Sequence, residues 1–272
     1  MEKAIILSPS RICRPGALKL INGATVYLGD EFCAHKQPSF KDFTAVRKLT
    51  GRNPVLMSSL LTEPALKKYI ALLSACAKKA PGTEIVVNDL GLLNFIDKNY
   101  RGVFSITLGR LITYLFDPKN TRVLGSRSDQ GLEGKKMKVW EATLEATPTP
   151  YIKRFLKRYA VERVETDSER IFLKYAKNTK VKISFYSPMR LMAMTRFCPF
   201  RGGIALECKE PCGTRLLKIR TPHLDYPLFS KGNAYFVKNR PVKHPRLDRT
   251  VTIPYVSSTG LKVYMNEGSL RG

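Results

Sequence analysis

The sequence lacks any run of about 18 apolar residues, so no transmembrane helix and no stable membrane insertion are expected. It has only three histidines, none of them in an HExxH pattern, and no order of Ser, His and Asp typical of a serine protease. No Gly-x-Gly-x-x-Gly motif follows an early apolar segment, which argues against a dinucleotide-binding sheet. The apolar stretch at residues 4–7 is too short for a secretory signal, and a cytoplasmic location is expected.

Acidic residues are also scarce: 22 Asp and Glu stand against 47 Lys and Arg in 272 residues, which gives a net charge of +25. This excess concerns partners and solubility rather than fold. RNA, an anionic membrane surface, an acidic subunit or an anionic substrate would each match it. The densest cationic stretch, residues 151–159, is interpreted as an amphipathic helix that buries Ile152, Phe155, Leu156 and Tyr159. Its cations and aromatics would also suit an RNA backbone with stacked bases.

Short β-like segments alternate with helical segments over the first 190 residues, a pattern typical of βαβ units around a parallel sheet. About seven or eight candidate strands predict an α/β fold of the (β/α)8 TIM-barrel type, regular or incomplete, although a doubly wound open sheet would show the same alternation. One barrel domain is expected over residues 1–215, with a β-rich C-terminal extension over 216–272 packed on it. The candidate strands are residues 4–7, 25–28, 54–57, 84–87, 103–107, 161–164 and 180–186.

Functional residues of a TIM-type barrel follow the carboxyl ends of its strands. Cys33 follows the second candidate strand by a few residues, and Asn88 and Asp89 directly follow the fourth. Asp89 is interpreted as the N-cap of the next helix, with substrate binding as the alternative for it and for Asn88. Tyr186 and Arg190, around the end of the seventh strand, are further candidates for the mouth of the barrel.

Three of the six cysteines, Cys198, Cys208 and Cys212, lie close together in a loop rich in glycine and proline. Thiolates are soft ligands that suit iron–sulfur clusters, zinc or Cu(I). Most clusters need four thiolates, and Cys33 is the candidate for the fourth. A tetrahedral zinc site and four unconnected thiols are the alternatives. Cys76 lies in an apolar helical run and is interpreted as a core residue.

Cations surround the cysteine-rich loop in the sequence. Arg196, Arg201, Lys209 and Arg215 would offset the net charge of a tetrathiolate cluster, which is about −2, and would raise its reduction potential. The same cations would suit a phosphate group. Cys13, near the N-terminus, is interpreted as a plain free thiol.

Three segments carry a family resemblance. They are TVYLGDEFC at residues 25–33, VNDLGLL at 87–93 and PMRLMAMTRFC at 188–198, the last followed by Cys208-x3-Cys212. In this order and context they resemble the collagenase-like peptidase family (family U, number thirty-two), and most of all its ubiquinone-biosynthesis (UbiV-type) branch.

The resemblance implies a barrel with a [4Fe–4S] cluster held by Cys33, Cys198, Cys208 and Cys212. It also implies oxygen-independent hydroxylation, either of a ubiquinone precursor, as one subunit of a heterodimer of related chains, or of tRNA and rRNA bases. Peptidase activity is not expected because no protease constellation is present, and no catalytic residue is identified. We therefore expect a hydroxylase subunit with an iron–sulfur cluster. An RNA-modifying or RNA-binding factor and a zinc-binding structural or peptidase-like protein are the alternatives.

Overall fold

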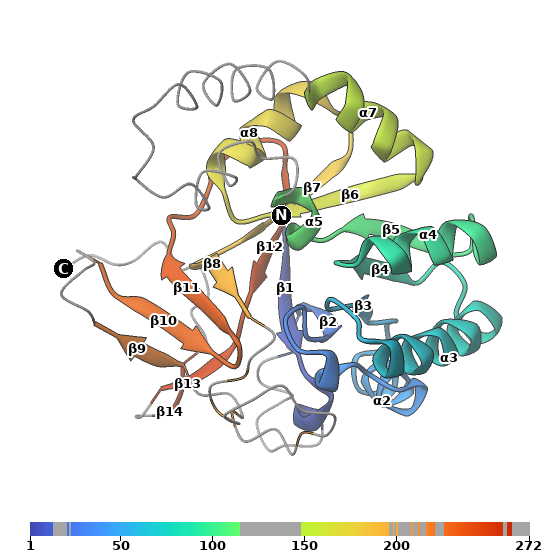
Figure 1. Ribbon diagram of the computed structural model, residues 1–272, viewed down its shortest axis with the longest axis horizontal. Helices are drawn as coiled ribbons and strands as arrows, with labels where there is room; N and C mark the ends of the chain where they lie inside the picture. Colours follow the sequence, from blue (N-terminus) through green and yellow to red (C-terminus); the bar gives the residue numbers. More distant parts are fainter. Residues whose placement is uncertain are drawn as a thin grey trace, which may run out of the picture.

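The structure, a computed structural model, describes residues 1–12, 21, 23–114, 148–195, 198, 200, 208, 212, 216–220, 226–257 and 260–262. Eight parallel strands of the described chain close into a barrel (Figure 1), which confirms the expected TIM-type fold. In their order around the barrel they are β1 (Glu2–Leu7), β12 (Leu247–Thr252), β7 (Lys182–Tyr186), β6 (Val161–Thr166), β5 (Ser105–Leu108), β4 (Glu84–Val87), β3 (Val55–Met57) and β2 (Thr25–Gly29).

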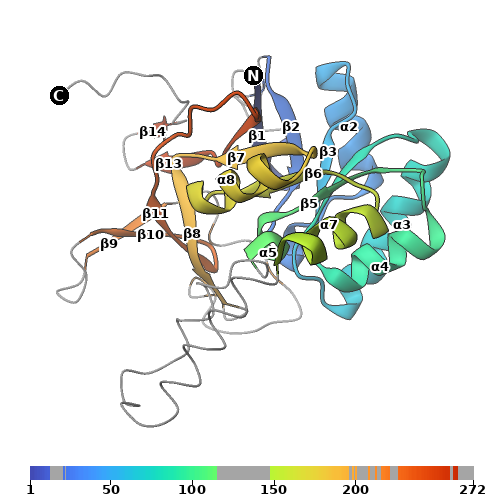
Figure 2. The ribbon, with the colours of Figure 1, turned by 90° about the horizontal axis from the view of Figure 1, so that it is seen from above.

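Helices between the strands cover the outside of the barrel (Figures 1 and 2). No helix within the described residues has the length and apolar character needed to cross a membrane. The α-helices are α2 (Phe40–Thr50), α3 (Glu63–Lys79), α4 (Leu90–Asn99), α5 (Arg110–Thr113), α7 (Pro148–Arg158) and α8 (Glu169–Asn178), and the 3-10 turns are η1 (Pro9–Arg11) and η2 (Ala34–Lys36).

A second, antiparallel sheet stands beside the barrel (Figure 2). Its strand order is β8 (Met189–Met194), β11 (Ala234–Lys238), β10 (Leu228–Lys231) and β9 (Leu217–Ile219). A two-stranded ribbon, β13 (Tyr255–Ser257) and β14 (Gly260–Lys262), follows the last barrel strand.

The expected boundary at residue 215 does not separate the barrel from the rest of the chain. β12, which lies in the segment assigned to a C-terminal extension, pairs in parallel with both β1 and β7 and is therefore the strand that closes the barrel. The chain leaves the barrel after β7, forms the antiparallel sheet, and returns for its eighth strand. The sheet is thus an insertion between the last two barrel strands.

Local sequence signals set the helix starts. Ser39 and Asp42 form a reciprocal capping box at the start of α2, and the Asp89 side chain accepts a hydrogen bond from the Leu92 amide at the start of α4. Thr62 occupies the N-cap position of α3 without a side-chain hydrogen bond, and Pro64 in the first turn accounts for the start of that helix.

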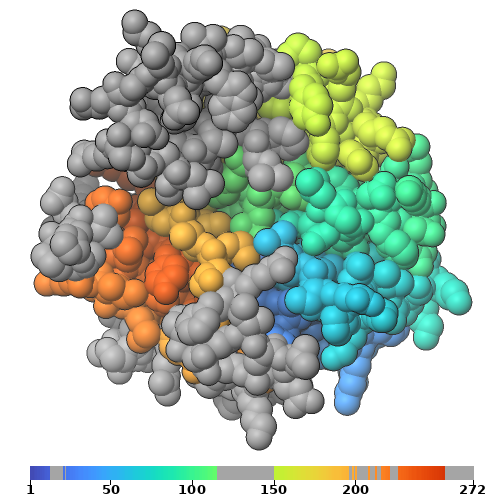
Figure 3. Space-filling view, viewed as in Figure 1, coloured from blue at the N-terminus to red at the C-terminus, as the bar shows by residue number. Residues whose placement is uncertain are grey.

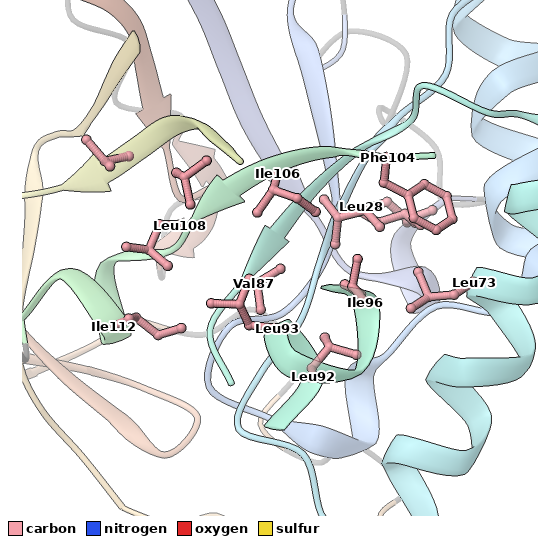
Figure 4. Packing of buried hydrophobic residues seen from close by; sticks show 14 of the residues in the cluster. Leu28, Leu73, Val87, Leu92, Leu93, Ile96, Phe104, Ile106, Leu108 and Ile112 are labelled. Atoms are coloured by element: carbon pink, nitrogen blue, oxygen red, sulfur yellow. The ribbon is translucent and has the colours of Figure 1, made fainter. Parts of the chain in front are cut away.

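Apolar side chains alternate between two faces of the strands, because successive residues of a strand point to opposite sides. The outward-facing set packs against the helices, and the inward-facing set continues into the second sheet through residues such as Phe229 and Phe236. Figure 4 shows the outer layer with Leu28, Val87, Ile106 and Leu108 of the strands and Leu73, Leu92, Leu93 and Ile96 of the helices. Cys76, which is fully buried in this layer, is the core residue expected from the sequence.

Candidate functional site

Charged side chains stand one or two residues after the ends of three strands, at the carboxyl end of the barrel. Arg110, after β5, donates from Nε to Glu31 Oε2 at 2.9 Å, and from Nη1 to Asp167 Oδ2 at 2.8 Å. Its Nη2 also pairs with Glu31, so that the guanidinium binds this carboxylate through two nitrogens. The three side chains are almost completely buried, at 0% exposure for Arg110. We call this set the Arg110 cluster.

Aromatic rings and backbone groups enclose the Arg110 cluster. The guanidinium carbon lies 4.0 Å from the centre of the Tyr186 ring and 5.3 Å from that of Phe32, distances typical of cation–π contacts. Burial opposes the charge on Arg110, but Glu31 and Asp167 outweigh this effect and raise its pKa. The cluster is therefore a fixed ion pair that joins the ends of β2, β5 and β6.

Cysteines that are far apart in the sequence come together next to the Arg110 cluster. Lys36 of η2 donates from Nζ to the Sγ atom of Cys212 at 3.2 Å, across 176 residues of chain. Cys33 lies near both Lys36 and Cys208, since their charges contribute to its pKa. Cys212 is buried, and Cys33 and Cys208 are half-buried. Two of the four expected ligands, Cys33 and Cys212, thus act on one buried ammonium group, and Cys208 acts on Cys33.

Cys198 belongs to a segment that is tied to the Cys33 segment by one side chain. The Nδ2 atom of Asn233 donates to the backbone oxygen of Phe32 at 2.8 Å and to that of Thr195 at 2.6 Å. Phe32 directly precedes Cys33, and Thr195 stands three residues before Cys198, which is half-buried. Asn233, in the turn between β10 and β11, therefore links the early and late cysteine-bearing segments.

Positive charge is concentrated beside the cysteines. A small cavity at the ends of β1 and β2 is lined by Arg11, Lys36 and Lys231, with Asp30 as its one carboxylate. Arg11 and Lys36 are buried, and burial lowers the pKa of Lys231 to about 8. Asp30 is also held by the structure, because its Oδ1 atom accepts from the Phe32 and Cys33 amides at 2.9 and 3.0 Å. The turn that presents Cys33 is fixed by these bonds.

The surroundings of Cys33 disfavour a free thiolate. Burial, followed by the negative charges of Asp30 and Cys208, raises the pKa of its thiol to about 12, whereas nucleophilic cysteines have lowered pKa values. A metal would displace the proton on binding. In the part of the chain that is described, no three His, Cys, Asp or Glu side chains converge in the way that a single metal ion requires.

An apolar pocket of about 650 Å³ opens on the other side of the Arg110 cluster, at the ends of β4 and β5. Most of its lining is aliphatic, and the few polar side chains include Tyr114 and Arg190. In Figure 3 the surfaces of α5 (green) and of the segment around β8 (amber), which both line it, meet near the centre of the face. A pocket with this lining at the mouth of a TIM-type barrel is suited to a largely apolar ligand.

The expected mouth residues take different roles. Asn88 and Asp89 line the pocket, but their side chains are engaged by the fold: Asn88 Nδ2 donates to Ser58 O at 2.9 Å, and Asp89 accepts from the Leu92 and Leu61 amides. Capping is thus the role of Asp89 that the geometry supports. Arg190 lines the pocket as expected, whereas Tyr186 lies fully buried inside the barrel.

Replacement of Glu165 by glutamine tests whether an ionisable carboxyl group is buried inside the barrel. Glu165 is fully buried, its Oε2 atom accepts from Tyr186 Oη at 2.7 Å, and burial raises its pKa from 4.5 to about 7. Between pH 4.5 and about 7 the folded state therefore binds more protons than the unfolded state. The free energy of unfolding of the parent falls as the pH rises through this range. Glu165→Gln stays neutral, and its unfolding free energy relative to the parent should increase by about 3 kcal/mol from below pH 4.5 to above pH 7.

The measurement is urea unfolding of both proteins at several pH values. Glu162→Gln is the matched control, because Glu162 is exposed on the outer face of the same strand. It should show no such trend with pH. A Glu165→Gln curve parallel to that of the parent would contradict the burial of an ionisable carboxyl group at this position.

The sequence interpretation missed the Arg110 cluster and the cations Arg11, Lys36 and Lys231. Glu31, Arg110 and Asp167 all stand directly after the end of a strand or one residue further, which is the signal that selected Cys33 and Asp89. If this positional signal had been applied to every charged residue, it would have identified the Arg110 cluster. The expected free thiol Cys13 and the cations Arg196, Arg201, Lys209 and Arg215 lie outside the described residues.

Comparison of the chain with protein-family models, with curated proteins and with solved structures finds no match. The family resemblance of the three sequence segments therefore remains an expectation, and the function has to be argued from the residues of this chain.

Proposed function

We propose that this chain is an iron–sulfur protein of the collagenase-like peptidase type and a subunit of an oxygen-independent hydroxylase. Its [4Fe–4S] cluster would be held by Cys33, Cys198, Cys208 and Cys212. The observation that carries the proposal is the hydrogen bond from Lys36, three residues after Cys33, to the thiol of Cys212. It brings cysteine-bearing segments from distant parts of the chain to the end of the barrel where enzymes of this fold keep their active sites.

The excess of cations beside the cysteines supports a cluster over four free thiols. Arg11, Lys36 and Lys231 line one small cavity with Asp30, and Lys36 also donates to Cys212. A [4Fe–4S] cluster with four thiolates carries about −2, because the thiolates face a +2 core, and cations close to it would stabilise this charge.

A cluster is proposed over a single zinc ion because of the family resemblance of residues 25–33, 87–93 and 188–198. Zinc requires four ligands at about 2.0–2.3 Å from one point, and no group within the described ranges is arranged in this way. A cubane cluster holds its thiolates farther apart, since its own iron and sulfide atoms lie between them.

The apolar pocket would hold the substrate. When bound, the cluster supplies the electron transfer that hydroxylation without O₂ requires. The Arg110 cluster stands between the two sites: Glu31 is two residues from Cys33, and Asp167 accepts a hydrogen bond from the hydroxyl group of Tyr114 in the pocket wall. These residues would fix the pocket relative to the cluster and keep water out of the path between them. Arg190 would meet a polar group of the substrate at the pocket wall.

Anaerobic purification followed by metal analysis tests the proposal. We expect about four irons and four sulfides per chain and a broad absorbance shoulder near roughly 400 nm, as thiolate-bound clusters give. A colourless protein with one zinc per chain, or with no metal after anaerobic reconstitution with iron and sulfide, would overturn it.

A further inference from the structure

A groove at the opposite end of the barrel from the cysteines has its own chemistry. It has a volume of about 700 Å³ and lies between the last turns of α7 and α8, at the start of β6 and β7 (the helices are in the upper part of Figure 1). Its floor is formed by small and aliphatic residues such as Leu156 and Val181. Four lysines line it and define what we call the lysine groove: Lys153, Lys157, Lys177 and Lys180.

Within the described residues, no carboxylate neutralises the positive charge of the lysine groove. All four lysines are exposed, the lining contains no carboxylate, and none of the four takes part in an ion pair within the described chain. By contrast, Lys67 on α3 pairs with Glu63 at 3.0 Å, and Asp97 on α4 is shared by Arg101 and Arg158. Four like charges around one recess repel one another, so a structural role alone would not gather them there.

Helix electrostatics accounts for part of this arrangement only. Lys157 and Lys177 stand in the last turns of α7 and α8, where the helix dipole favours cations. Lys153 is one turn further back, and Lys180 follows α8 in the connection to β7. That connection is held in place by Arg246, whose Nη2 atom donates to Thr179 O at 3.0 Å and to Val181 O at 2.9 Å. The groove is therefore a fixed recess, and a fifth cation supports one of its walls.

We propose that the lysine groove binds single-stranded nucleic acid through its phosphates. Lysines act as point charges on successive phosphates, and a charged groove that follows the backbone is the usual means of holding a single strand. The lysines line a recess, which a flexible strand can enter and a flat lipid surface cannot. The excess of 47 Lys and Arg over 22 Asp and Glu adds a long-range attraction for the same polyanion. Docking there leaves the mouth of the barrel open, so this inference does not depend on the iron–sulfur proposal.

The test is fluorescence anisotropy of a labelled oligouridylate of about 12 nucleotides, within the range of known single-strand sites, titrated with the full anaerobically purified chain. In the groove variant all four lysines are replaced by glutamine. We expect its affinity at about 50 mM salt to fall at least tenfold, and the slope of log K against log salt to decrease by about 3 for four lost phosphate contacts. Circular dichroism and iron content should match the parent.

In the matched control, glutamine replaces four exposed lysines of α2, α3 and α4: Lys48, Lys68, Lys78 and Lys98. This variant loses the same charge as the groove variant. It should keep most of the parent's affinity. Equal binding by the two variants would overturn the proposal in favour of diffuse charge attraction. A parent that binds phosphatidylserine vesicles but neither oligouridylate nor oligothymidylate would overturn it in favour of a membrane surface.

Discussion

Replacement of Arg110 by methionine is expected to destabilise the protein by about 3–5 kcal/mol. The substitution keeps an unbranched side chain of similar length but removes the charge that Glu31 and Asp167 share. Both carboxylates would then stay buried without a counter-charge, and a buried charge that lacks one costs far more than the net gain from the intact pair. Urea unfolding at neutral pH measures the loss.

Two further variants make this result specific to the Arg110 cluster. Arg101→Met removes an arginine that is 56% exposed, and its partner Asp97 keeps Arg158 as a second cation. This change should cost no more than about 1 kcal/mol. Adding Glu31→Gln and Asp167→Asn to Arg110→Met should recover part of the lost stability, since it neutralises the carboxylates that were left behind. If Arg110→Met were as stable as Arg101→Met, the buried ion pair described above would be wrong.

The second large effect is expected from Cys208→Ser, which should lose most of the iron and sulfide. Cys208 lies close enough to Cys33 to contribute to its pKa, and under the proposed function both are ligands of one cluster. A cluster with three thiolates is poorly held, because a serine hydroxyl is a harder ligand than a thiolate. Iron and sulfide per chain, measured after anaerobic purification, give the result directly.

Cys76→Ala is the control for this experiment. Cys76 is fully buried in α3, where it packs in the outer layer of the barrel and serves as a small apolar residue. Its loss should leave the iron content unchanged. Full cluster content in Cys208→Ser would exclude this residue as a ligand, whereas equal loss in both variants would point to damaged folding rather than to coordination.

The barrel strands were predictable because each is a short apolar segment between turn residues. The segments expected at 25–28, 84–87 and 161–164 correspond to β2, β4 and β6 within one or two residues. Buried parallel strands need apolar side chains on both faces, and that demand is visible in the sequence itself. The helix over residues 151–159 was predictable from its apolar periodicity, and Ile152 and Leu156 are buried in α7 as that periodicity predicts.

The eighth strand was misassigned for a physical reason. β12 carries Arg249 inside the barrel, where its guanidinium bonds Glu84 through two nitrogens at 2.8 and 2.9 Å and Tyr27 Oη at 2.7 Å. A strand that contains aspartate, arginine and threonine resembles a solvent-facing segment. Its partners lie 165 and 222 residues away, so nothing near it in the chain indicates that its charge is compensated.

The amino-acid sequence by itself determined where most strands and helices form, that they build a parallel α/β fold, and which four cysteines are candidates for one site, because apolar periodicity, capping residues and soft ligands are local properties. Only the tertiary structure decided which charges are buried together. Arg110 meets Glu31 across 79 residues and Asp167 across 57, and Lys36 meets Cys212 across 176. A buried charge is stable only beside its counter-charge, and closure of the barrel is what brings the two together.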